Sequence, residues 1–425
     1  MKNKNLKEAS ALKWVTVQDV GEILTGTTPS KKDERNYGNF MPLIKPPDLK
    51  DGQIIDGQDH LSEFGTKSAR ILPENSVLVS CIGNIGKTGI NIKPVAFNQQ
   101  INAIIFNENV IPRFGLYYFQ SSEAKQWLIN HSSATTISII NKTKFSKTPF
   151  PVPPLEEQKK IVSKIEELFS HLDAGVVGLK RAQTALKRYR ASVLKAAFEG
   201  RLVPQDRNDE PVEKLLNNKG VKVLDRNKYK PIPNSWGWTR LENCVVILDR
   251  QRKPVNSKVR EKRIAGKNIS DLYPYYGATG QVGWIDDFIF DEELVLLGED
   301  GAPFLDTNKD KAYIVKGKFW VNNHAHVLRA NCDLTTNRFI LYYLNYFDFS
   351  NYVTGTTRLK LNQTKMKSIP IIIPPFDEQN RIVEEIDRRL SIISEIKKSI
   401  KVGFQNSDYL KSAILKSAFE GDLIK

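Results

Sequence analysis

Two long stretches of the chain carry apolar residues at alternating steps of three and four positions. Such a stripe lies along one side of an α-helix, as in the seam of a coiled coil. The pattern predicts two long amphipathic helices, each of which must bury its stripe, with the other helix as the nearest partner. Arg389, Ser407 and Ser417 interrupt the second seam. The seam residues are Ile161, Ile165, Leu168, Leu172, Gly175, Leu179, Ala182, Leu186, Tyr189, Val193 and Ala196, then Ile382, Ile386, Ile393, Ile396, Ile400, Leu410 and Ile414.

The first of these predicted helices has typical end signals. Pro154 suits a first turn, and Glu156 and Glu157 complement the positive end of the helix dipole. Gly200 stands where a left-handed cap ends a helix. At 1.5 Å per residue, a helix between these signals is about 65 Å long.

The sequence ahead of each long helix has a different pattern. Short apolar runs broken by Gly, Pro, Asn and Asp extend from residue 14 to about 150 and again from 236 to about 373. Val77–Val79 is typical of a strand, and Leu116–Asn130 of one amphipathic helix. Each region is therefore predicted to be a mixed α+β domain.

The chain also repeats itself. Residues 135–203 align without a gap with residues 356–424, 221 positions later, and 22 of the 69 paired residues are identical. Thr135-Thr136 matches Thr356-Thr357, whereas the segments between the copies match only in short stretches. A repeated segment with different sequences between its copies indicates two versions of one structural unit. Such an arrangement suits the recognition of two different targets at a fixed distance.

These signals predict an α+β protein with a pseudo-twofold internal repeat, in which two globular domains are separated by two long antiparallel α-helices acting as a coiled-coil spacer. The expected division is a first domain over residues 1–152, a helical spacer over 153–203, a polar connector over 204–235, a second domain over 236–373 and a second helical spacer over 374–425.

Charge and composition narrow the function. The net charge of +15 attracts polyanions, nucleic acid first and anionic membrane second. Cys81, Cys244 and Cys332 form no CxxC pair, and an odd number argues against a disulfide framework. The N-terminal residues lack the apolar core of a signal peptide, and the most apolar run is far too short to span a bilayer. We expect a soluble, cytoplasmic protein with no membrane partner.

Signals for catalysis are weak. Residues 83–88 resemble a phosphate-binding loop, but the pattern needs glycine where Cys81 stands. Residues 373–376 resemble an amino-methyltransferase loop, but Ile373 cannot hold a target amine as asparagine would. His324 and His326 flank one residue of a strand-like stretch and have no further ligands in the sequence, which favours a structural role. We expect no catalytic residue and no metal site.

Basic residues cluster in loops at matching places of the two domains. Residues 250–267 carry eight Lys or Arg against the single acid Glu261. Such side chains neutralise phosphates, and Arg also reads base edges in the major groove, although a merely solubilising loop is the alternative. The predicted DNA-binding residues are Lys31, Lys32, Arg35, Arg250, Arg252, Lys253, Arg263, Arg358 and Lys360.

The order of short motifs resembles the specificity subunit of type I restriction–modification systems over essentially the whole chain. The motifs are PPLEEQ (153–158) and PPFDEQ (374–379), LKAAFEG (194–200) and LKSAFEG (415–421), LVPQD (202–206), YYGATG (275–280) and a TT-x4-N-x-TK stretch ahead of each long helix. Each motif is weak alone, but their order, given twice, is specific. The interrupted second seam departs from a regular helix pair.

The resemblance implies two target-recognition domains, each reading one half of an asymmetric, bipartite site in double-stranded DNA. The helices would fix the gap between the halves and dock two modification subunits. The resemblance also implies that this chain is not an enzyme and holds no cofactor. Methyl transfer and ATP-driven cleavage would belong to separate modification and restriction subunits, which use S-adenosylmethionine, ATP and Mg²⁺.

Two other classes of protein stay open at this point. A coiled-coil adaptor with two protein-binding heads would bind its partners with little dependence on salt, whereas a DNA reader loses affinity steeply as salt rises. A self-contained methyltransferase or nuclease would need a cofactor loop or a carboxylate cluster, and the sequence displays neither.

Overall fold

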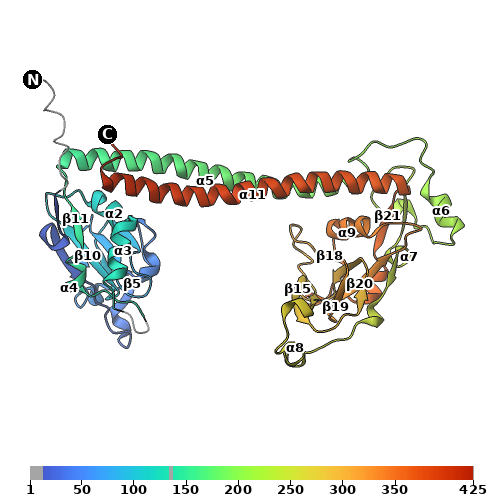
Figure 1. Ribbon diagram of the computed structural model, residues 1–425, viewed down its shortest axis with the longest axis horizontal. Coiled ribbons are helices and arrows are strands. Elements are labelled where there is room, and N and C mark those ends of the chain that lie inside the picture. Colours follow the sequence, from blue (N-terminus) through green and yellow to red (C-terminus); the bar gives the residue numbers. More distant parts are fainter. Residues whose placement is uncertain (1–12, 134–136, 425) are drawn as a thin grey trace, which may run out of the picture. The chain divides into compact units, whose positions relative to one another are not determined.

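The computed structural model describes residues 13–133 and 137–424, so the matched pair Thr135-Thr136 lies outside the described residues. Contacts divide the chain into two compact units. The first unit holds residues 1–179 together with 401–425, and the second holds residues 180–400 (Figure 1). Among the described residues, no helix is both long and apolar enough to cross a membrane.

Two long helices form as predicted, and each runs through both units. They are α5 (Leu155–Phe198) and α11 (Phe376–Glu420), with 44 and 45 residues. In the first unit, Ile161 near the start of α5 packs in one apolar cluster with Phe419 near the end of α11. In the second unit, Phe198 at the end of α5 shares a cluster with Ile382 near the start of α11. Within each unit, therefore, the two helices are antiparallel.

The interruptions of the second seam have local explanations. Arg389 turns to Glu385, one helical turn earlier, with 2.6 Å between Nε and a carboxylate oxygen. Ser407 is buried despite its hydroxyl. Ile396 and Leu410 lie on the predicted seam but are 40% and 45% exposed. Burial is thus uneven along the seam, because Ile386 and Ile165 are fully buried.

The first domain contains two main sheets. Residue Ile101 of one central strand pairs with Ser80 of its neighbour. The five-stranded sheet has the order β2 (Gly21–Thr25), β10 (Ile101–Phe106), β7 (Val77–Ser80), β8 (Thr88–Asn91) and β4 (Gly52–Ile54). The four-stranded sheet has the order β5 (Asp59–Leu61), β3 (Tyr37–Ile44), β9 (Val95–Phe97) and β6 (Ile71–Leu72). β1 (Trp14–Thr16) pairs with β11 (Pro149–Pro151), and α1 (Glu63–Thr66) and α4 (Lys142–Phe145) are single-turn helices.

The prediction of a single helix over Leu116–Asn130 is wrong. The structure has two helices, α2 (Pro112–Gln120) and α3 (Ser122–Asn130). Ser121 between them is extended, with ψ near 155°, and its hydroxyl accepts the Ala124 N–H at 3.2 Å. A serine that caps a new helix starts a second axis even though the apolar spacing continues across it.

The second domain repeats this frame. Ala325 pairs with Gly298, as Ile101 pairs with Ser80 in the first domain. Its first sheet has the order β13 (Val245–Ile247), β20 (Ala325–Ala330), β17 (Leu294–Gly298) and β18 (Ala312–Val315), and the other has the order β15 (Gly280–Ile285), β14 (Tyr273–Gly277), β19 (Lys318–Val321) and β16 (Phe290–Asp291). β12 (Gly237–Arg240) pairs with β21 (Pro370–Ile373), and the helices are α7 (Leu241–Cys244), α8 (Ser257–Ile264), α9 (Asn337–Tyr346) and α10 (Gln363–Lys367).

The connector is not a free linker. It forms α6 (Val212–Asn218), whose Val212 and Leu216 are buried in the same apolar cluster as Trp236. The Trp236 indole N–H donates to the buried Glu378 carboxylate of α11 at 2.8 Å. Burial raises the pKa of Glu378, although the hydrogen bonds that it accepts work in the opposite direction. The connector is thereby packed into the apolar core of the second unit.

We predict unequal costs of truncation along the second seam. Changing Ile386, which is fully buried, to Ala should lower the stability of the second unit by about 2–5 kcal/mol, because a cavity remains. The matched change Ile396→Ala, at a residue 40% exposed, should cost less than about 1 kcal/mol. Thermal and urea unfolding of both variants measure the difference. Equal losses would show that the seam is packed evenly along its length.

Candidate nucleic-acid interface

The basic segment 250–267 opens the second domain as a turn, η5 (Asp249–Gln251), followed by helix α8 (Figure 1). Asn256 caps α8 by accepting the Val259 N–H at 2.9 Å. α8 buries none of its residues. Arg250 and Lys253 are exposed to solvent, as the prediction of DNA contacts requires.

Arg252 and Arg263, by contrast, are engaged within the domain. The Arg252 guanidinium donates to Glu299 at 2.8 Å and to the Ala325 carbonyl at 2.7 Å, and its side chain is only 14% exposed. Arg263 donates to Asp286 at 2.6 Å and lies over the ring of Trp320. A DNA contact by either guanidinium would have to break these pairs, so the structure gives both a role within the domain.

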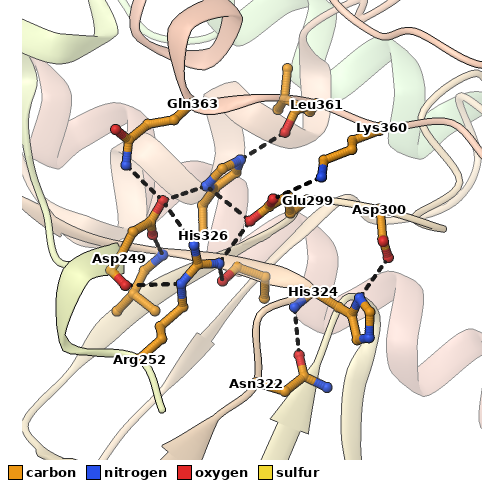
Figure 2. Close-up of polar contacts among 12 residues, drawn as sticks. Asp249, Arg252, Glu299, Asp300, Asn322, His324, His326, Lys360, Leu361 and Gln363 are labelled. Atoms are coloured by element: carbon orange, nitrogen blue, oxygen red, sulfur yellow. Dashed lines mark hydrogen bonds and ion pairs between the residues drawn. The ribbon is translucent and has the colours of Figure 1, made fainter. Parts of the chain in front are cut away.

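Arg252 belongs to a buried charged cluster that joins three separate parts of the second domain. Figure 2 shows Asp249, Arg252, Glu299 and His326 pointing toward one another. His326 Nδ1 lies 2.6 Å from Asp249 Oδ2, and Nε2 lies 2.9 Å from the Leu361 carbonyl oxygen. Burial alone raises the pKa of Asp249, but the contacts with His326, the Val327 N–H and Arg252 outweigh it, so this pKa falls below its usual range.

The cluster has the residue types of a metal site, and this possibility was invisible in the sequence. One ligand atom each from Asp249, Glu299 and His326 lie within 4.8 Å of one another. Their oxygens, however, already accept hydrogen bonds from the Arg252 guanidinium, the His326 ring and the Gln363 amide. Arg252 thus supplies positive charge where a cation would sit, and these contacts favour the predicted structural role of His326.

Arg358 and Lys360 lie on the loop that precedes α10. We call residues 354–361 the pre-helix loop. Arg358 donates to Asp300 at 2.6 Å, and Lys360 Nζ lies 3.5 Å from Glu299. Backbone hydrogen bonds from Gly301 N–H to the Leu359 carbonyl and from Leu361 N–H to the Glu299 carbonyl fix the loop against the end of β17. Both basic side chains are more than half exposed, at 61% and 54%.

In the first domain the predicted residues share one turn. Lys31 and Lys32 are exposed, and Arg35 forms an ion pair with Asp33 at 2.8 Å while it lies over the ring of Phe64. The structure thus groups the predicted residues locally. The first domain has this turn, and the second has η5, α8 and the pre-helix loop. Asp249 and Glu299 could not be identified from the sequence, because only the strand register brings them to His326.

Comparison with known proteins identifies the class. Residues 11–175 and 247–402 match the family model described as the type I restriction modification DNA specificity domain. The two matches cover more than half of the chain, which therefore belongs to this family of type I specificity subunits. The family defines DNA specificity, so the catalytic steps of such systems lie outside this chain.

Individual relatives agree. The chain is 23% identical to the EcoKI specificity subunit of Escherichia coli, over 96% of this chain and 89% of that one. It is 36% identical to a putative type I restriction enzyme specificity subunit of Haemophilus influenzae, over 37% of this chain and 38% of that one.

Solved structures give the same fold. A structure described as the basis of complex assembly and conformational transition of the type I R-M system matches with a TM-score of 0.72 and 18% identity, over 98% of this chain and 100% of that one. The HsdS subunit of Thermoanaerobacter tengcongensis matches with a TM-score of 0.55 and 17% identity, over 99% and 100% of the two chains.

We predict that Arg252 and its neighbour Arg250 differ in what they stabilise. Arg252→Met leaves Asp249 and Glu299 buried without their cation and should destabilise the second domain by about 3–5 kcal/mol in the absence of DNA. Arg250→Met, at an exposed position, should change stability by no more than about 0.5 kcal/mol. Thermal unfolding without DNA is the measurement. Similar melting temperatures for the two variants would contradict the stabilising role of Arg252 and favour its predicted contact with DNA.

Proposed function

We propose that this chain selects the DNA sequence on which a type I restriction–modification complex acts. In this proposal each globular domain reads one half of a bipartite, asymmetric site in double-stranded DNA. The observation that carries it is a repeated frame that presents different side chains at equal positions. Ile137 and Ile139 of the first domain correspond to Arg358 and Lys360 of the second. Apolar side chains suit thymine methyl groups, whereas Arg and Lys suit guanine or phosphate.

The two long helices are proposed to set the gap between the half-sites, because each runs through both units. They are also proposed to dock two modification subunits. Support comes from large apolar side chains exposed along the helices, which mark protein contacts on an otherwise charged surface. These residues are Val177, Tyr189, Ile392, Val402 and Tyr409, the last of which is 73% exposed. Restriction subunits would join this assembly, and S-adenosylmethionine, ATP and Mg²⁺ would bind to the partner subunits. A DNA target would place the complex in the cytoplasm.

An exchange of domains tests the division of labour. Replacing residues 14–150 with the corresponding segment of another family member should change one half of the methylated sequence and leave the other half intact. Replacing residues 236–373 should do the converse. Methylation mapping in cells that also supply the modification subunit provides the measurement. A change of both halves by either exchange would contradict the assignment of one half-site to each domain.

Salt dependence separates the DNA reader from the adaptor. For the assembled methyltransferase, the logarithm of DNA affinity should fall linearly with the logarithm of salt concentration. Lys253→Ala should weaken binding to target and scrambled duplexes alike and reduce that slope by about one, as expected for one phosphate contact. Binding that is indifferent to salt would favour the adaptor. An unchanged slope for the variant would remove Lys253 from the interface.

A further inference from the structure

The two domains hold the segment before their helices by the same backbone hydrogen bonds. In the first domain, Ile139 N–H donates to the Ser133 carbonyl at 3.0 Å, and Ile140 N–H to the Cys81 carbonyl at 2.9 Å. In the second, Lys360 N–H donates to the Thr354 carbonyl at 2.8 Å, and Leu361 N–H to the Glu299 carbonyl at 2.7 Å. Glu299 of the second domain therefore stands where Cys81 stands in the first.

Strand register extends this correspondence to the buried cluster. Because Ile101–Ser80 and Ala325–Gly298 are equivalent pairs, Asn102 and His326 occupy equal positions. Each of these two side chains contacts a polar side chain that lies on the neighbouring strand or just after its end. Thr25 donates its hydroxyl to Asn102 Oδ1 at 2.6 Å, and Asp249 Oδ2 lies 2.6 Å from His326 Nδ1.

At five equivalent positions around this site, the first domain has neutral side chains and the second has ionisable ones. Burial raises the pKa of the Cys81 thiol to about 12, against the smaller effect of its contacts with Asn102, so this thiol stays neutral. No member of the first set changes charge between pH 5 and 9. The first set is Thr25, Cys81, Asn102, Ile137 and Ile139, and the second is Asp249, Glu299, His326, Arg358 and Lys360.

His326 faces two hydrogen-bond acceptors. The Leu361 carbonyl can only accept, and Asp249 is held as a carboxylate by its contacts. Each ring nitrogen therefore faces an acceptor, and only a ring with hydrogen on both nitrogens can donate to both. The charged groups around it are Asp249 from η5, Arg252 just after η5, Glu299 after β17, with an oxygen 3.8 Å from Nδ1, and Lys360 of the pre-helix loop, which reaches the cluster through Glu299.

We propose that His326 is a positioning residue for reading the second half-site. As an imidazolium it ties Asp249 to Leu361 and so holds the pre-helix loop that presents Arg358 and Lys360. A neutral ring has one N–H and cannot make both ties, so the loop is held less firmly after deprotonation. Reading of the second half-site, but not of the first, therefore weakens as pH rises. The inference rests on the proposed function of the second domain.

The test uses the assembled methyltransferase and duplexes with a substitution in one half-site at a time, the half-sites being assigned by the domain exchange. Affinities relative to the intact target are measured from pH 5.5 to 8.5. Discrimination at the second half-site should fall roughly tenfold as pH rises, the worth of one hydrogen bond to a charged group. Discrimination at the first half-site should stay constant.

Two variants test whether His326 is the residue responsible for the pH dependence. His326→Asn installs the side chain that the first domain uses and should remove the pH dependence, leaving discrimination at the high-pH level of the parent. His324→Asn is the matched control. His324 lies 2.8 Å from Asp300 and beside Arg358 at the surface, so its loss should leave the pH dependence in place. The opposite result, with the pH dependence lost only in His324→Asn, would overturn the assignment.

If His326→Asn fails to fold, the pH dependence of discrimination by the unmodified protein still tests the proposal. Second-half-site discrimination that is present but constant with pH would refute the positioning role while leaving the proposed function intact. Equal binding of the intact and substituted duplexes at every pH would refute the proposed function itself.

Discussion

The burial of two apolar helix stripes is the constraint on which the rest of this structure depends. Neither α5 nor α11 could stand alone in water with Ile161, Ile165, Ile382 and Ile386 uncovered. In each unit, part of one helix covers part of the other, and the globular domain adds its own apolar side chains to the same cluster, as Phe114 does beside Phe419 at 5.3 Å between ring centres. Helix pairing and domain folding therefore bury one shared apolar cluster in each unit.

The sequence predicted the parts of the fold that follow from periodicity. The two long helices and the repeat were readable because apolar spacing and local identity extend over tens of residues. The break at Ser121 was missed because a single capping residue leaves the apolar spacing intact. Domain packing was also beyond reach, since it depends on contacts such as that between Trp236 and Glu378, far apart in the chain.

The candidate interface was predicted unevenly for a similar reason. A run of basic residues identifies a surface, but it does not reveal which members turn inward. Arg252 and Lys253 are neighbours, yet only Arg252 turns inward to two acids, Asp249 three residues earlier and Glu299 just after β17. The internal repeat, by contrast, contains information about which residues of the two domains are equivalent. Once Ile101 and Ala325 are known to be equivalent, the residues that follow them align, and the contrast between Asn102 and His326 becomes visible.

That contrast has an energetic side. Burying Asp249, Glu299, Arg252 and His326 together costs desolvation of every charge, and neutral side chains hold the same frame in the first domain. The backbone hydrogen bonds around the pre-helix loop are the same in both domains, so the fold does not require the charges. The charges add an anchor for basic side chains, because Glu299 and Asp300 form ion pairs with Lys360 and Arg358. A scaffold whose loops are fixed by main-chain bonds leaves its side chains free to differ, and this freedom lets one frame present two chemically distinct surfaces.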